Sequence, residues 1–189
     1  MLELNFKPFP KIISSRLRLR EISNEDVEEI LYLRGTEKIM QYIGKPLCKN
    51  VDDALQHIKK ITDGILNMTG IFWGITLKDD PKLIGVISLH NIDKEHHRAE
   101  LGYILNDKHW RKGIINEAVS VVIEFGFERM GLHSIEAKID PLNSGSRSLL
   151  LKHHFVKEAY FKENYYFDGK FVDTEIYSLL KNFQTPTST

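Results

Sequence analysis

Two periods of hydrophobic spacing alternate along the chain, and each predicts a different kind of element. Residues 16–22 (RLRLREI) alternate polar and apolar side chains, which is the period of a half-buried strand. A helix is predicted after them, because Ser23 or Asn24 can cap it and apolar residues recur at helical spacing up to Gly35. Residues 51–67 carry a second helical apolar stripe. The pattern therefore predicts a strand followed by two helices.

Two stretches of this first third carry little pattern. Residues 1–15 are expected to form an irregular arm, and residues 36–50 are expected to form a loop around Gly44-Lys45-Pro46.

The middle of the chain returns to strand-like spacing. Three runs rich in β-branched and aromatic residues are separated by short polar segments suited to hairpin turns, namely residues 70–77, 82–92 and 98–105. These runs predict a three-stranded antiparallel meander.

The last third mixes both kinds of element. Its predicted order is a deeply packed helix after Gly113, a strand, a short helix and a hairpin that turns at Asp168-Gly169. Residues 184–189 (QTPTST) are predicted to form a disordered tail. No repeat or linker divides the chain, so residues 1–189 are expected to form one domain. Its fold class is predicted to be α/β, with a mixed, largely antiparallel sheet flanked by helices.

Composition and charge remove several classes of function. The 189 residues contain 26 Lys plus Arg and 26 Asp plus Glu, and this balance argues against a nucleic-acid-binding domain. No apolar run is long enough for a membrane span, and the N-terminus does not read as a signal peptide. Cys48 is the only cysteine, which excludes an internal disulfide and fits a reducing compartment, so a cytoplasmic location is expected.

Candidate chemistry begins where the packed helix starts. The first amides of a helix have no intrahelical partner and carry partial positive charge. Gly113 lets a ligand approach this backbone, and Arg111 and Lys112 add full positive charge. The stretch therefore predicts an anion site, best suited to phosphate or pyrophosphate, although an ordinary solvated turn explains it about as well. Neither GxGxxG nor GxxxxGK[ST] is present, so a dinucleotide or a nucleoside triphosphate is not favoured.

Four segments in order give a more specific signal. They are RLRLREISNED (16–26), AELGYILNDKHWRKGIINEA (99–118), DPLNSGSRSLLLKHHFVKE (140–158) and YYFDGKFVDTEIYSLL (165–180). From Arg16 to Leu180 the chain resembles the GNAT superfamily of acyl-coenzyme A-dependent N-acetyltransferases. The likeness is greatest to the branch that acetylates the N-termini of ribosomal proteins.

The resemblance implies acetyl-CoA as co-substrate and a set of residues that contact it. The family signature [QR]xxGx[GA] corresponds to Trp110, Arg111, Lys112, Gly113, Ile114 and Ile115, whose amides would hold the pyrophosphate, and Asn116 follows in the same turn. The strand LGYIL would splay from HSIEAKI, so that backbone groups near Ile104 and Leu105 pair with the pantetheine arm, and Asn143 would also contact the cofactor. Trp110 and Ile115 depart from the signature, and Ile115 must point into the core for phosphates to bind.

Two residues are candidates for proton transfer. Glu100 lies on the strand that should line the cleft and is predicted to act as the base, directly or through water; an ordinary cross-strand salt bridge is an equal alternative. The tyrosine that many relatives use as the acid corresponds here to Leu150. The resemblance instead implies Ser146, three residues after Asn143, as the acid, with helix capping as the alternative. Cys48 is not expected to be a nucleophile.

The remaining polar residues receive simpler interpretations. The adjacent pairs His96-His97 and His153-His154 lack zinc-site spacing, so no metal is predicted. His90 is more readily explained as a satisfied surface histidine than as part of the acceptor pocket. The tyrosines of the last hairpin, Tyr160, Tyr165 and Tyr166, are expected to pack on the sheet.

The predicted function is transfer of an acetyl group from acetyl-CoA to a primary amine by direct attack, without a covalent enzyme intermediate. The acceptor stays open between a protein N-terminus, an amino acid, a polyamine and an antibiotic amine. Its pocket is expected between the first two helices, their loop and the closing hairpin. The alternative function is an acyl-CoA-binding sensor or regulatory module without turnover. A homodimer is compatible with the family, but no stretch of the sequence indicates one.

Overall fold

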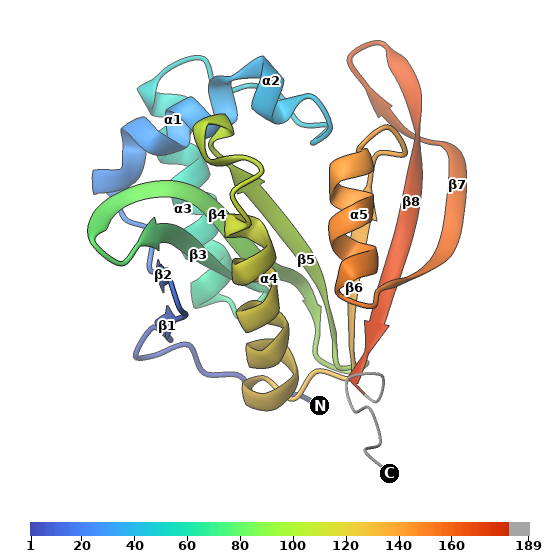
Figure 1. The fold of residues 1–189 in the computed structure, drawn as a ribbon, viewed down its shortest axis with the longest axis horizontal. Helices are drawn as coiled ribbons and strands as arrows, with labels where there is room; N and C mark the ends of the chain where they lie inside the picture. The colour runs from blue at the N-terminus through green and yellow to red at the C-terminus, as the bar shows by residue number, and fades with distance from the viewer. Residues whose placement is uncertain (182–189) are drawn as a thin grey trace.

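An eight-stranded sheet in the order β1-β2-β3-β4-β5-β6-β8-β7 organises the computed structural model, which describes residues 1–181 (Figure 1). Every neighbouring pair is antiparallel except β5 and β6, which are parallel. The strands are β1 (Ile12–Ile13), β2 (Leu17–Arg20), β3 (Gly70–Leu77), β4 (Asp80–Asp93), β5 (Arg98–Leu105), β6 (Ser134–Ile139), β7 (Val156–Phe167) and β8 (Lys170–Leu180). The predicted tail, residues 184–189, lies outside the described residues.

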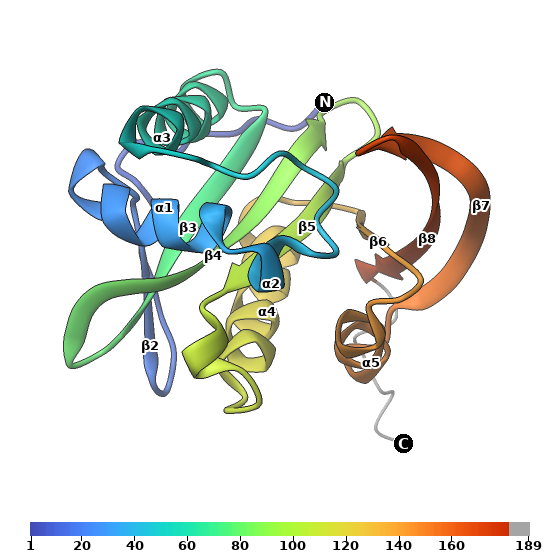
Figure 2. The same cartoon turned by 90° about the horizontal axis from the view of Figure 1, so that it is seen from above.

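Helices cover both faces of this sheet. They are α1 (Val27–Gly35), α2 (Glu37–Met40), α3 (Val51–Leu66), α4 (Ile114–Glu124), which continues as a π-helical turn over Phe125–Arg129, and α5 (Ser144–Lys152). Figure 2 shows α1 and α3 on one face of the sheet and α4 and α5 on the other. Two apolar clusters match this arrangement: the larger contains the buried face of α4, and the smaller lies between α1, α3 and β4. The predicted α/β class with a mixed, largely antiparallel sheet is confirmed.

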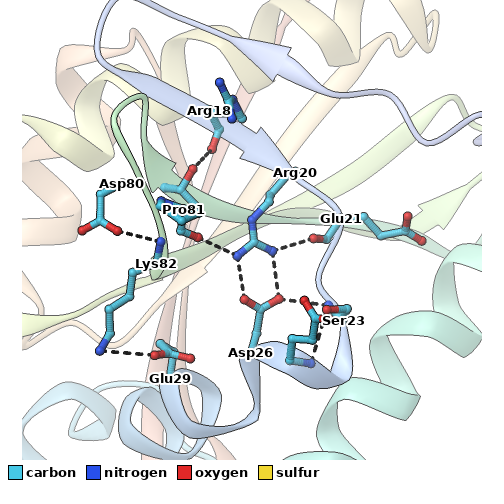
Figure 3. A network of polar contacts seen from close by, with 11 residues as sticks. Arg18, Arg20, Glu21, Ser23, Asp26, Glu29, Asp80, Pro81 and Lys82 are labelled. Carbon is cyan, nitrogen blue, oxygen red and sulfur yellow. Dashed lines mark hydrogen bonds and ion pairs between the residues drawn. The ribbon is translucent and has the colours of Figure 1, made fainter.

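The start of α1 is fixed by a polar network. Asp26 closes a capping box with Ser23, and its carboxylate also receives two hydrogen bonds from the Arg20 guanidinium, at 2.6 and 2.9 Å (Figure 3). The same guanidinium donates to the carbonyl oxygens of Glu21 and Pro81. Strand β2, the 3-10 turn Asn24–Asp26 that leads into α1 and the start of β4 are therefore held together, so the sequence-predicted capping segment caps this turn and also joins it to the sheet.

Most predicted elements are present, with two additions. The meander β3-β4-β5 and the final hairpin turning at Asp168-Gly169 are confirmed. The arm is not wholly irregular, because Ile12–Ile13 pairs with β2, and Leu2 and Phe6 are buried in the core. The segment 36–50 contains the four-residue helix α2, too short to show a hydrophobic period.

The parallel pair β5–β6 separates soon after it begins. Only three residue pairs are in register, and the last joins Glu100 to Glu136. Beyond this point β5 continues along β4 to Leu105, while β6 continues along β8 to Ile139. Figure 1 shows the two strands close together near the bottom of the view and diverging upward between α4 and α5. The predicted splay is present, and it leaves one edge of β5 without a strand partner.

Candidate active site

A cleft of about 910 Å³ opens where β5 and β6 diverge. Its lining comes from α1, the α2–α3 loop, α3, strands β3 to β6 and the start of α5. Glu100, Ile104, Asn143 and Ser146 are among the lining residues, so the sheet brings these separately predicted positions to one place. The closing hairpin is not in the lining, which differs from the prediction for the acceptor pocket.

The N-terminus of α4 has the backbone form that the anion site requires. Gly113 is its N-cap residue with a left-handed φ of 74°, and Arg111 also has a positive φ of 60°. No side chain caps this helix, so its first amides have no intrahelical or capping acceptor. Successive amides in such a turn converge on an anion. The backbone of this loop therefore fits a pyrophosphate.

A cation that sequence reasoning missed stands beside this loop. Arg16 donates to the carbonyl oxygen of Lys112 at 3.0 Å, and a Cβ added at Gly113 would lie 3.4 Å from its Nη2 atom. Glu117 holds Arg16 in place through an ion pair of 2.6 Å and also accepts from the Ser14 hydroxyl at 2.7 Å. Arg16 could not be identified from local sequence, because the β1–β2 turn that carries it meets α4 only in the folded chain.

The other signature residues divide between core and surface. Ile114 is buried, and Ile115 packs against the larger apolar cluster, as phosphate binding requires of a bulky side chain there. Asn116 is half-buried, and its Oδ1 atom has no hydrogen-bond partner among residues 1–181. Trp110 is partly exposed, with Lys38 Nζ 5.2 Å from its ring centroid.

Strand β5 presents backbone groups to the gap at alternate residues. The Asn106 amide donates to a β4 carbonyl at 2.9 Å, so Asn106 and Ile104 direct their backbone groups toward β4. The groups of Tyr103 and Leu105 therefore face the open edge. Leu105 also accepts the Trp110 indole N–H at 2.9 Å. Leu105 stays a predicted partner of the pantetheine arm. Ile104 was expected to pair with the arm through its backbone, but its backbone faces β4 and its side chain lines the cleft.

Two hydroxyl groups meet across the splayed strands. The Tyr103 hydroxyl on β5 and the Ser146 hydroxyl on α5 lie 2.5 Å apart, and Ser146 is buried. Burial raises the pKa of Tyr103 to about 12, although the Ser146 hydrogen bond works in the opposite direction. Asn143 caps α5 by accepting the Ser146 amide at 3.0 Å. The cap thus belongs to Asn143, and the Ser146 side chain is directed toward Tyr103.

Glu100 is held in a network of polar contacts on the cleft wall. Its Oε2 atom accepts from Lys138 at 2.9 Å and from Asn91 at 3.0 Å, while His90 Nε2 lies 3.6 Å from its Oε1 atom. Burial favours the neutral acid, but the hydrogen bonds from Lys138 and Asn91 and the nearby His90 imidazole outweigh it and lower the pKa of Glu100 to about 2. The salt-bridge interpretation is therefore present in the structure, with Lys138 as the partner, and the catalytic interpretation stays a prediction.

His90 lines the cleft, in contrast to the surface position expected for it. Its Nδ1 atom lies 3.1 Å from the Ser88 hydroxyl, and its Nε2 atom faces Glu100. The strand period places residues 88, 90, 100 and 102 on one face, but only the register of β4 with β5 puts His90 opposite Glu100.

The wall formed by α1, α3 and their loop carries further titratable groups. Cys48 lines the cleft, and burial raises the pKa of its thiol, which makes it a poor nucleophile. Arg34 and His57 are half-buried beside it. Burial, together with the positive charges of Arg34 and Lys60, lowers the pKa of His57 to about 4.

The closing hairpin reaches this wall from the other side of the splay. The Tyr165 hydroxyl on β7 donates to the Gly44 carbonyl oxygen at 2.7 Å. Tyr160, Tyr165 and Tyr166 are all exposed, so they lie on the surface of the hairpin, where the Tyr166 ring packs on its cross-strand neighbour Phe171.

Among residues 1–181, no three His, Cys, Asp or Glu side chains are grouped closely enough to hold a metal ion. No helix among these residues is both long and apolar enough to cross a membrane.

Comparisons with known proteins agree with this geometry. Residues 16–156 match the family model described as an acetyltransferase (GNAT) domain. The chain is 35% identical over 173 residues to the uncharacterized N-acetyltransferase YoaA of Bacillus subtilis (strain 168). The aligned region covers 92% of this chain and 98% of that protein. It is 29% identical over 119 residues to the ribosomal protein uS5-alanine N-acetyltransferase of Escherichia coli (strain K12), covering 62% of this chain and 61% of that protein.

A solved structure shares the fold over most of the chain. The ribosomal L7/L12 alpha-N-protein acetyltransferase RimL, in complex with coenzyme A, superposes with a TM-score of 0.82 at 19% identity, covering 90% of this chain and 98% of that one. The matched family model spans most of the described residues, including the loop before α4 and the cap of α5. The chain therefore belongs to the GNAT family of acetyltransferases.

Proposed function

We propose that this acyltransferase moves an acetyl group from acetyl-CoA to a primary amine by direct attack of the amine on the thioester. The observation that carries the proposal is a cleft where the unpaired edge of β5 meets a wall of titratable residues. The uncapped N-terminus of α4 is not part of the cleft lining, but the hydrogen bond from Trp110 to the Leu105 carbonyl ties the loop before it to the end of β5. Acetyl-CoA supplies an activated acyl group with a thiolate as leaving group.

The cofactor is held mainly by backbone. Amides from Arg111 to Asn116 bind the pyrophosphate, with Gly113 allowing close approach and Arg16, Arg111 and Lys112 adding charge. Tyr103 and Leu105 pair with the pantetheine arm at the strand edge. Trp110 fixes the Leu105 carbonyl through its indole N–H, and Asn143 orients α5 toward the same gap.

Proton transfer is assigned to two pairs of side chains. Ser146 donates a proton to the departing thiolate, and Tyr103 orients the Ser146 hydroxyl. On the acceptor side, Glu100 and His90 remove the proton of the amine. Glu100 alone is a weak base because its pKa is about 2, so the His90 imidazole, whose Nε2 atom lies 3.6 Å from Glu100 Oε1, is assigned the role of proton acceptor. The raised pKa of Cys48 favours direct attack over an acetyl-enzyme.

Calorimetric titration with acetyl-CoA tests the proposal. The wild type should bind, and Gly113→Glu should abolish binding because its carboxylate would face the phosphates. Gly169→Glu is the matched control, since Gly169 also has a positive φ, of 78°, but stands in the β7–β8 turn with nothing within 4 Å of an added Cβ. It should bind as the wild type does.

Turnover is then measured as thiol release with a panel of amines. Release with at least one amine, and no acetyl adduct in the intact mass of the protein, supports direct transfer. Binding without release from any amine would favour the sensor interpretation. An absence of binding by the wild type would contradict the whole assignment.

A further inference from the structure

We infer that the acceptor is a small primary amine that also carries an anion, a carboxylate or a phosphate, and that Arg34 binds this anion. The inference rests on the proposed function, since it names the class of amine used. It is carried by the wall of the cleft that α1, α3 and the α2–α3 loop form.

Arg34 is a guanidinium without a counterion. It lies in the last turn of α1, half-buried, and lines the cleft. Its Nε atom is buried and has no hydrogen-bond partner among residues 1–181, and no carboxylate in this range lies within 4.0 Å of it. Burying a charge without a partner is costly, and the planar guanidinium matches the two oxygens of a carboxylate or phosphate. An anionic group of the substrate would complete this site.

The neighbours of Arg34 are mainly cationic or neutral. Lys60 and His57 come from α3, and His57 is uncharged at neutral pH because its pKa is about 4. A neutral imidazole can donate one hydrogen bond to an anion. The α2–α3 loop adds Lys45 and Lys49 to the lining. We call these four cations, Arg34, Lys45, Lys49 and Lys60, the basic patch.

Two carboxylates in the lining offset its positive charge only in part. Asp53 accepts the Lys49 amide at 2.7 Å near the cap of α3 and forms no ion pair with a described residue, so its charge counts against one cation of the basic patch. Glu100 is already paired with Lys138, a fifth cation of the lining. The cleft therefore carries an excess of positive charge, which repels a polyamine and attracts an anion.

The basic patch lies on the same side of the sheet as the proposed base. Glu100 and Ile104 share one face of β5, since they are four residues apart on a strand. Ile104 packs against the apolar cluster of α1 and α3, so Glu100 faces this layer as well. Figure 2 shows α1 and α3 covering this face. An acceptor in the cleft can thus place its amine at the His90–Glu100 pair and its anion at Arg34.

Binding of matched amines to the full chain separates this inference from the proposed function. Two pairs differ only in the anion: β-alanine against 3-aminopropanol, and O-phosphoethanolamine against ethanolamine. Spermidine serves as the cationic probe. Each is titrated by calorimetry into the protein alone and into its complex with coenzyme A. At least one anion-bearing member should bind about tenfold more tightly than its neutral partner, and the two pairs distinguish carboxylate from phosphate.

Two variants locate the preference. Arg34→Gln should remove most of the preference for the anion-bearing amine over its neutral partner. Lys60→Gln should weaken this preference without disturbing the fold, because the Lys60 side chain is more exposed. Lys59→Gln is the matched control, because Lys59 is the adjacent residue of α3, pairs with Asp63 and does not line the cleft. It should bind as the wild type does.

The inference is overturned if spermidine or the neutral amines bind as tightly as the anionic ones, or if Arg34→Gln and Lys60→Gln both keep the preference. Failure of the proposed function would look different: acetyl-CoA would not bind, or no amine would cause thiol release. The amine titrations without coenzyme A still decide the anion preference in that case.

Discussion

At the scale of single residues, the chemistry depends on contacts between side chains that are far apart in sequence. Ser146 could be identified as a candidate from the resemblance to the family, which implies a serine three residues after Asn143, but Tyr103 could not. On β5 its side chain alternates away from Glu100, and nothing in a strand pattern indicates that α5 will place a hydroxyl 2.5 Å from it. Glu100 shows the same limit, because its partner Lys138 belongs to a different strand.

The hydroxyl pair predicts a loss of turnover that is specific to Ser146. Ser146→Ala should lower kcat by about 10²-fold, the usual size of an acid catalyst's contribution, with little change in acetyl-CoA affinity. Tyr103→Phe should lower kcat less, since it removes only the group that orients Ser146. Thiol release under saturating acetyl-CoA measures both. Ser148→Ala, an exposed serine of the same helix, is the control and should retain full kcat.

Glu100 gives a prediction about stability and pH. Its folded-state pKa of about 2 is below the ordinary value of 4.5, so its ionised form stabilises the fold above pH 4.5 and this contribution is lost as the pH falls toward 2. Glu100→Gln should therefore lower the free energy of unfolding by roughly 1–3 kcal/mol near pH 7. Urea unfolding of both proteins should show the difference shrinking between about pH 5 and pH 3. A difference that is constant with pH would contradict the ion-pair assignment.

At the scale of elements, helix ends determine where the site lies. Helix α4 begins at an uncapped glycine and is open to an anion, whereas α5 begins at an asparagine that uses its side chain as a cap. The start of α4 was predictable, because a glycine before a packed helix is a local signal. The cap of α5 was not, since capping was considered for Ser146 and is provided by Asn143. The part played by Arg16 was not, since it reaches α4 from a turn about a hundred residues earlier in the chain.

Two substitutions of Asn143 distinguish its structural role as the cap of α5 from a contact with the cofactor. Asn143→Ala should lower the free energy of unfolding by about 1 kcal/mol, because the Ser146 amide loses its acceptor. Asn143→Asp keeps an acceptor at the cap and should leave stability nearly unchanged, while it removes the amide N–H donors. Weaker acetyl-CoA binding by Asn143→Asp, measured by calorimetry, would assign a cofactor contact to Asn143. Unchanged binding would limit Asn143 to capping.

At the scale of the whole molecule, two lobes of sheet meet at three residue pairs of β5 and β6 and face each other across the cleft. The order of elements and the antiparallel meander were predictable from periodicity. The basic patch was not, because it combines α1, α3 and a loop with little pattern, and such charges look like ordinary surface residues in sequence. The exposure of the hairpin tyrosines was also missed, since a strand pattern does not say which face a neighbouring element will cover.

The contact between Tyr165 and Gly44 joins the closing hairpin to the α2–α3 loop, next to the cleft-lining residues Ile43 and Lys45. Tyr165→Phe removes this hydrogen bond and should raise the KM for the acceptor by about two- to fivefold, with unchanged affinity for acetyl-CoA. Tyr166→Phe is the control, because the adjacent Tyr166 is 62% exposed and its ring packs on Phe171. Steady-state kinetics with the best amine of the panel measure both. Equal KM values for Tyr165→Phe and the wild type would show that this bridge does not shape the acceptor site.

The short pairing of β5 with β6 also affects how quickly the protein is degraded. In the proposed binding mode, a cofactor arm along the free edge of β5 would supply contacts that the chain itself lacks, so the bound protein would unfold less often than the free one. At a hundredfold excess of ligand over its Kd, mass action adds about 2.7 kcal/mol to the free energy of unfolding. Degradation by a protease that attacks the opened chain should slow accordingly. The abundance of this enzyme would then follow the supply of its own acetyl donor.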